Sequence, residues 1–92
     1  MFTNSATNVE SSSATLNGLL DPHGLTTTVY FEYGRTTSYG LSTALQSQTG
    51  NGYRTITANI NGLSASTTYH FRIVAINSAG ARPGIDRTFT TP

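Results

Sequence analysis

The clearest pattern in this chain is an alternation of side chains between Leu63 and Asn77. Two interleaved sets of residues make it up, namely Tyr69, Phe71, Ile73 and Ala75 in one set and His70, Arg72, Val74 and Ile76 in the other. A period of two places the two sets on opposite faces of a β-strand. The pattern therefore predicts a strand over Thr68–Asn77 with the first set buried.

The residues just before this strand predict how it is anchored. Leu63 and Tyr69 lie six positions apart across a short polar turn. In a tyrosine corner, a buried tyrosine so placed bonds through its hydroxyl to the backbone of the preceding turn. We expect Tyr69 to do this with Leu63 close by, an arrangement that is typical of a β-sandwich.

The rest of the chain divides into short alternating runs separated by Gly, Pro and Asn, which is the pattern of an all-β domain. It predicts no helix and seven strands: Ala6–Val9, Ser12–Leu19, Thr26–Tyr33, an edge strand at Ala44–Thr49, Tyr53–Ile60, Thr68–Asn77 and Ile85–Thr91. Short connections favour antiparallel Greek-key pairing. The fold class expected is thus a seven-stranded antiparallel Greek-key sandwich.

The apolar positions of these strands predict the core. The inward residues are expected to include Ala14, Leu16, Val29, Phe31, Tyr33, Ile56, Ala58, Ile60 and Phe89, and the irregular stretch 35–52 offers Tyr39, Leu41 and Leu45 as further anchors. A turn is expected at Asp21–Gly24, with Pro22 presetting φ at its second position. A second turn is expected at Thr49–Gly52, and a loop at Ser78–Gly84.

Composition narrows the class of protein. The chain of 92 residues fits one domain, residues 1–92 with a core at about 6–91, and its 17 Thr and 10 Ser supply polar strand faces with few charges. The five basic residues are all Arg and do not cluster, so no nucleic-acid surface is expected. Cysteine is absent, which excludes disulfides and thiolate metal sites. No run approaches the ~20 apolar residues of a membrane span, and the first residues lack the features of a signal peptide.

Three segments resemble the fibronectin type III family, whose fold is immunoglobulin-like. The segment VYFEYG at 29–34 is similar to the family's third strand. The segment LSASTTYHFRIVAIN resembles the pattern L-x-P-x-T-x-Y followed by Ala and Asn, here at Leu63, Thr67, Tyr69, Ala75 and Asn77. Gly80 and the closing FTT resemble the last loop and strand. The resemblance covers about residues 6–91 and is closest to a bacterial branch found in large surface and secreted proteins.

The chain departs from the family pattern at two positions. Ala65 stands where the family usually has Pro, and Gly18 where it has a buried Trp. Another aromatic residue is then expected to fill the space between the sheets, the candidates being Tyr39, Tyr53 and Phe31. The cell-adhesive tripeptide Arg-Gly-Asp of one family member is missing, so the resemblance does not imply integrin binding.

Residues that could carry a reaction are few and scattered. The two histidines, His23 in the predicted turn and His70 on the outer face of the long strand, lie in no motif that would orient them against a nucleophile. The four acids Glu10, Asp21, Glu32 and Asp86 fall on different elements, with Asp86 expected to pair with Arg87 or Arg82. We therefore expect no enzyme, no cofactor and no metal site.

One surface and one set of loops remain as candidates for partner contact. Tyr30 and Glu32 point outward from one predicted strand, and His70 and Arg72 from its expected neighbour. Glu32 paired with Arg72 or His70 is first a cross-strand pair that stabilises the sheet, and a binding patch is the second interpretation. Val74 and Ile76 share this face. We expect either that a loop or linker covers them or that they contact a neighbouring domain. The end loops around His23 and Arg82 are the other candidate.

These observations favour a non-catalytic structural spacer or interaction module of a larger extracellular or cell-surface protein. Its partners would be the neighbouring domains of that protein, with no nucleic acid and no membrane insertion. One alternative is a module that binds carbohydrate or protein through the outer sheet face or the end loops. Another is self-association into a dimer or fibre through an exposed strand edge within Arg35–Gly52, where no Lys blunts the edge.

Overall fold

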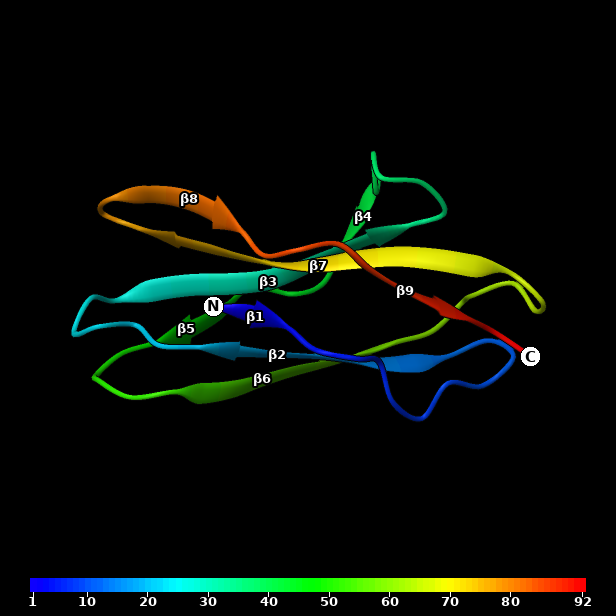
Figure 1. Cartoon of the computed structure of the whole chain (residues 1–92), viewed down its shortest axis with the longest axis horizontal. Helices are drawn as coiled ribbons and strands as arrows, with labels where there is room; N and C mark the ends of the chain where they lie inside the picture. The colour runs from blue at the N-terminus through cyan, green and yellow to red at the C-terminus, as the bar shows by residue number, and fades with distance from the viewer.

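The computed structural model describes residues 1–92 and consists of two antiparallel sheets stacked face to face (Figure 1). The smaller sheet has the order β1-β2-β6, with β1 at Phe2–Thr3, β2 at Ala14–Leu20 and β6 at Arg54–Ile60. The larger sheet has the order β4-β3-β7-β8, with β5 also paired to β3 and β9 to β7. Its strands are β3 Thr27–Gly34, β4 Leu41–Ser42, β5 Gln46–Gln48, β7 Thr68–Asn77, β8 Gly80–Pro83 and β9 Arg87–Thr90.

The all-β sandwich is confirmed, and so is the strand Thr68–Asn77 with its buried set of alternate residues. The chain forms no helix, and therefore none that could cross a membrane. The structure has nine strands where the sequence predicts seven, because two short strands, β4 and β8, form outside the predicted ranges. These two strands and the first strand are where the sequence-based assignment is wrong.

The first strand lies earlier than predicted. β1 occupies Phe2–Thr3, whereas the expected strand Ala6–Val9 contributes one isolated bridge between Thr7 and Thr15. Asn8 has a positive φ of 49°, which turns the backbone away from β2. Thr3 is pulled inward instead, where its hydroxyl accepts a hydrogen bond from the Ile73 amide at 3.3 Å.

The last strand is interrupted, and part of the predicted loop is a strand. β8 lies within the expected loop Ser78–Gly84, and β9 begins only at Arg87. At the break the Gly84 amide donates to the Ile73 carbonyl at 2.7 Å, and a Cβ on Gly84 would lie 2.6 Å from the Thr3 hydroxyl oxygen. This close approach needs glycine, and it leaves Ile85 at 68% exposure.

The stretch after β3 is anchored by a polar residue. Leu41 and Leu45, expected as core anchors, are 55% and 69% exposed, so that prediction is wrong. Thr43 takes their place, since its amide donates to the Phe31 carbonyl and its hydroxyl accepts from the Phe31 amide, both at 2.9 Å. Thr43 thus adds two hydrogen bonds to β3 between the backbone pairings of β4 and β5, and both leucines stay exposed.

The turn after β2 is displaced by one residue from its predicted place. The Leu25 amide donates to the Pro22 carbonyl at 3.0 Å, so the central residues are His23 and Gly24, with φ of 51° and 77°. Two successive positive φ values are those of a type I′ turn. Pro22 therefore stands at the first position, and Asp21 caps the turn by accepting from the His23 amide at 2.9 Å.

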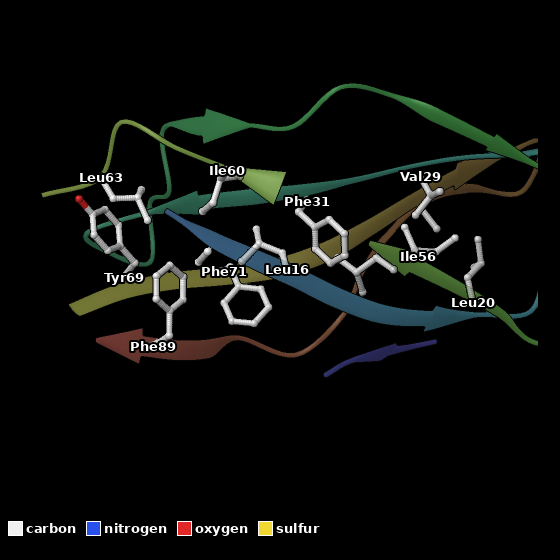
Figure 2. Packing of buried hydrophobic residues seen from close by; sticks show 13 residues of the cluster. Leu16, Leu20, Val29, Phe31, Ile56, Ile60, Leu63, Tyr69, Phe71 and Phe89 are labelled. Atoms are coloured by element: carbon white, nitrogen blue, oxygen red, sulfur yellow. The ribbon is translucent and has the colours of Figure 1, made fainter. Parts of the chain in front are cut away.

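The core lies between the sheets and is built from alternate residues of the long strands (Figure 2). Its largest fully buried side chains include Phe31, Phe71, Leu16 and Ile56. Of the aromatics proposed to replace the family's buried Trp, Phe31 lies between the sheets, while Tyr53 is 60% exposed and Tyr39 lies on the outer face. Gly18 leaves room for Ile73, whose Cδ1 would be 2.8 Å from a Cβ at that position.

Candidate functional site

The outer face of the larger sheet carries a group of polar and aromatic side chains from β3 and β7. The register of these strands places Glu32 directly opposite Arg72. Arg72 donates from Nε and Nη2 to Glu32 Oε2, at 3.3 and 3.2 Å. The Tyr30 hydroxyl donates to Glu32 Oε1 at 3.5 Å. The cross-strand pair is therefore Glu32 with Arg72, and His70 has a different partner.

Two loops bring the remaining partners to this face. His70 Nδ1 lies 2.8 Å from Asp86 Oδ2, and the Tyr39 hydroxyl donates to Asp86 Oδ1 at 2.8 Å. Asp86 thus pairs with a histidine and a phenol, and not with Arg87 or Arg82 as the sequence suggests. Asp86 and Tyr39 both lie outside regular strands, where side-chain alternation gives no information on direction.

A cation–π contact joins the two groups. The guanidinium carbon of Arg72 lies 4.7 Å from the centre of the Tyr39 ring, within the range of a favourable contact. Six side chains from β3, β7 and two loops are thereby connected. We call them the outer-face cluster: Tyr30, Glu32, Tyr39, His70, Arg72 and Asp86.

Backbone geometry at one loop places Tyr39 in the cluster. Tyr39 has a φ of 57° and Gly40 a φ of 100°, and the Tyr39 amide donates to the Thr36 carbonyl at 3.0 Å. A left-handed aromatic residue is unusual and costs about 1–3 kcal/mol. The loop also packs closely on β3, since a Cβ on Gly34 would lie 1.8 Å from the Tyr39 carbonyl oxygen. The strained backbone of this loop therefore directs the Tyr39 ring toward Asp86 and Arg72.

The electrostatics of the cluster follow from these contacts. Burial raises the pKa of Tyr39 to about 12, aided by its hydrogen bond to the Asp86 carboxylate. Burial alone would raise the pKa of Asp86, but the hydrogen bonds from His70 and Tyr39 outweigh it and hold that pKa below its ordinary value. Burial, with the charge of Glu32 next, raises the pKa of Tyr30. At neutral pH the phenols of Tyr30 and Tyr39 are therefore protonated and Asp86 is ionised.

Apolar side chains continue the same face beyond the cluster. Tyr30, Val74 and Pro83 lie side by side across β3, β7 and β8, and Ile76 occupies the next row. Val74 points outward yet is only 5% exposed, because β8, part of the predicted loop, flanks it. Ile76 is 40% exposed. The outer face of the larger sheet therefore has an apolar part, around Val74 and Ile76, and a polar part, the outer-face cluster.

The loop residues singled out from the sequence lie elsewhere. His23 and Arg82 line a hollow of about 250 Å³ at one end of the sandwich, together with Met1 and Asn77. The His23 side chain is 80% exposed, and its Nδ1 lies 3.6 Å from Asp21 Oδ2. The structure thus brings Tyr30, Glu32, His70 and Arg72 together and keeps His23 and Arg82 apart from them.

The corner before β7 has the geometry of a tyrosine corner. The Ser64 amide donates to the Tyr69 hydroxyl oxygen at 2.8 Å, and this bond is the main cause of a lowered Tyr69 pKa. Leu63 is buried beside it, and the Tyr69 ring stacks on Phe89 with centroids 5.5 Å apart (Figure 2). Arg35 adds a bond from Nη2 to the Ser64 hydroxyl at 2.6 Å. These residues hold the fold, and Leu63, Ser64 and Tyr69 line a hollow of about 400 Å³ together with Tyr39 of the outer-face cluster.

The arrangement of the cluster suits recognition. Both carboxylates already accept hydrogen bonds from neighbouring side chains, so the polar groups are preorganised and lose little freedom on binding. Tyr and Arg next to an apolar patch is the composition enriched at protein interfaces. No three His, Asp or Glu side chains gather as a metal site would require.

Comparison with known proteins supports the fold. No family model and no curated protein matches the chain. Among solved structures, the sensor domain of the anti-sigma factor RsgI4 in Pseudobacteroides cellulosolvens is similar with a TM-score of 0.73 and 22% identity, over 98% of this chain and 90% of that one. The 6th fibronectin type III domain of human fibronectin type III domain containing protein 3 is similar with a TM-score of 0.65 and 22% identity, over 99% and 82%. The third fibronectin III domain of human KIAA0343 protein is similar with a TM-score of 0.55 and 17% identity, over 100% of this chain and 82% of that one.

Proposed function

We propose that this domain, a fibronectin type III-like sandwich, is a non-catalytic module of a larger exported protein, where it separates neighbouring domains and presents its outer-face cluster to a protein partner. The spacer role is the primary function. The observation that carries it is the placement of the two chain ends.

The chain ends at one end of the long axis and begins in the other half of the molecule, inward of the opposite end (Figure 1). Met1 lines the hollow beside Asp21 and His23, and the Pro92 carbonyl accepts from the Ser66 amide at the far end. The molecule measures 41 × 23 × 19 Å along its principal axes. A domain of this form extends a chain of which it is part along its long axis.

Hydrogen bonds fix the C-terminal residues to the body of the domain, which a spacer needs in order to set the position of the domain that follows it. Thr91 is buried, its hydroxyl donates to the Ser64 carbonyl at 2.7 Å, and its amide donates to the Thr67 carbonyl at 3.0 Å. The last residues are therefore tied to the turn that also holds the tyrosine corner. A following domain would inherit a defined direction.

The interaction role rests on the outer face of the larger sheet. Its cluster is preorganised, and Ile76 beside it is partly exposed, which gives a partner both polar and apolar contacts. The likeness to a domain described as a sensor supports a recognition role as well. The resemblance to domains of surface and secreted proteins, and the hydroxyl-rich, charge-poor composition, support an exported location.

Solution scattering on chains of one, two and three copies, joined directly from Pro92 to Met1, tests the spacer role. We expect the maximum dimension to rise with each copy by more than the 19–23 Å of the short axes and by no more than the 41 Å long axis. A rise near the 19–23 Å of the short axes would mean that copies fold back side by side, and would contradict the proposal.

A further inference from the structure

The outer face of the smaller sheet differs in character from the outer-face cluster. Its outward residues include Thr15 and Asn17 on β2 and Thr55, Thr57 and Asn59 on β6, because their neighbours in each strand point into the core. None of these side chains is charged. Leu19 on β2 also lies on this face, whose outward residues are thus uncharged and present hydroxyl, amide and aliphatic groups.

An exposed pair of aromatic rings lies at one end of this face. Phe2 and Tyr53 are 53% and 60% exposed, and their ring centroids are 6.2 Å apart with planes tilted by 33°. Phe2 pairs in register with Leu19, which pairs with Thr55, so the rings lie over the end of all three strands. Two exposed rings held together on a strand face form an apolar platform that the core does not need.

Free polar groups continue from the platform along β6. The hydroxyls of Thr55 and Thr57 make no hydrogen bond within the protein, and Asn59 uses only its Oδ1, which accepts from the Thr15 hydroxyl at 2.7 Å. The Asn59 amide nitrogen is left to donate outward. Tyr53 to Asn59 spans six residues, or about 20 Å along an extended strand.

A hollow closes the far end of the row. It has a volume of about 260 Å³ and is lined by Glu10, Ser13, Thr15 and Asn59 among others. The Glu10 carboxylate is a strong acceptor for hydroxyl donors. The face thus presents, in order, aromatic rings, uncharged hydroxyls, an amide and a polar recess.

We propose that this face binds a neutral oligosaccharide that lies along β6, with a sugar ring stacked on Tyr53 and Phe2. A sugar has an apolar C–H face, which packs on an aromatic ring, and hydroxyl edges, which exchange hydrogen bonds with Thr, Asn and Glu. A chain of several sugars repeats this combination over the length of the row. The outward residues of the row hold no positive charge, and Glu10 at its far end is an acid. Arg54, the exposed first residue of β6, donates to the Thr49 carbonyl at 3.3 Å. This distribution of charge disfavours acidic polysaccharides.

This site is independent of the proposed spacer and partner roles. It lies on the opposite sheet from the outer-face cluster, and neither Phe2 nor Tyr53 belongs to the core. Loss of sugar binding would therefore leave the scattering of joined copies unchanged, and the two proposals fail separately.

Affinity electrophoresis of the whole domain through gels containing a soluble β-glucan, a xylan or a mannan tests the proposal, with polygalacturonate as the acidic comparison. We expect retardation by at least one neutral polymer and none by the acidic one. Tyr53→Ala should weaken binding by about tenfold, and Tyr53→Phe, which keeps the ring, should retain it. Ile85→Ala, which removes an apolar side chain that is 68% exposed between β8 and β9, is the matched control and should bind normally.

Three results would overturn the inference. The first is no retardation by any of the three neutral polymers. The second is equal retardation of the natural domain and Tyr53→Ala, which would place the binding elsewhere. The third is a change in the scattering dimensions of joined copies on Tyr53→Ala, which would show that a neighbouring domain covers the rings. Because Tyr53 is exposed and outside β6, its replacement leaves the core intact.

Discussion

At the scale of single residues, a few hydrogen bonds and one glycine decide where segments go. The Thr43 hydroxyl, and no leucine, attaches the stretch after β3. The Thr3 hydroxyl draws β1 toward Ile73, and Gly84 lets the chain pass close to both. Each of these contacts depends on a single atom. Removing the hydroxyl oxygen of Thr43 or Thr3, or adding a Cβ to Gly84, would abolish it.

Tyr69→Phe tests the tyrosine corner at this scale. The change removes only the hydroxyl that accepts from the part-buried Ser64 amide, and it leaves that donor without its partner. We expect the free energy of unfolding to fall by roughly 1–3 kcal/mol in a denaturant titration.

Tyr53→Phe is the matched control for this experiment. Its hydroxyl makes no hydrogen bond within the protein and its ring is 60% exposed, so we expect stability within about 0.5 kcal/mol of the natural domain. A Tyr69→Phe domain as stable as this control would mean that the corner bond contributes nothing to the fold.

At the scale of elements, the long strands follow the sequence pattern and the connections do not. β2, β3, β6 and β7 are predicted to within about two residues, because alternation over seven or more residues leaves one register that buries the apolar set. β4, β5, β8 and β9 each have two to four residues, too few for alternation to fix a face. Tyr30, Glu32, His70 and Arg72 could be assigned to one face for the same reason, whereas Tyr39 and Asp86 could not.

Gly34→Ala tests the link between β3 and the loop that carries Tyr39. The added methyl would overlap the Tyr39 carbonyl, so the loop must move and its ring must leave Asp86 and Arg72. We expect the pKa of Tyr39 to drop from about 12 toward its ordinary value of 10. The measurement is phenolate absorbance against pH, with the Tyr39→Phe difference isolating this residue.

The same change has a consequence for stability at high pH. A pKa raised in the folded state means that Tyr39 stabilises the fold fully below pH 10 and that this contribution is lost as pH rises from 10 to about 12. We expect the loss to disappear in Gly34→Ala. Ser38→Ala, in the same loop and with no steric conflict, should keep both the raised pKa and the loss, and an unshifted Tyr39 in Gly34→Ala would contradict the account.

At the scale of the whole molecule, two sheets close over one core and expose two outer faces of different chemistry. The larger sheet carries charges, phenols and apolar residues, and the smaller sheet carries hydroxyls, amides and two exposed rings. The sequence predicts the two layers, because the alternation of apolar and polar residues along each long strand shows which side chains point inward and which point outward. It does not predict Phe2 beside Tyr53, because their contact depends on a β1 position that no periodicity marks.

Every proposal above depends on the sheets packing through their alternate residues, and a nuclear Overhauser spectrum of the isolated domain tests this most directly. We expect contacts from the rings of Phe31 and Phe71 to the methyl groups of Leu16 and Ile56 in the opposite sheet. The ring of Tyr53 should show no contact to those methyl groups. Contacts from Tyr53 to Leu16 or Ile56, or ring protons of Phe31 open to solvent, would contradict the sandwich and both faces built on it.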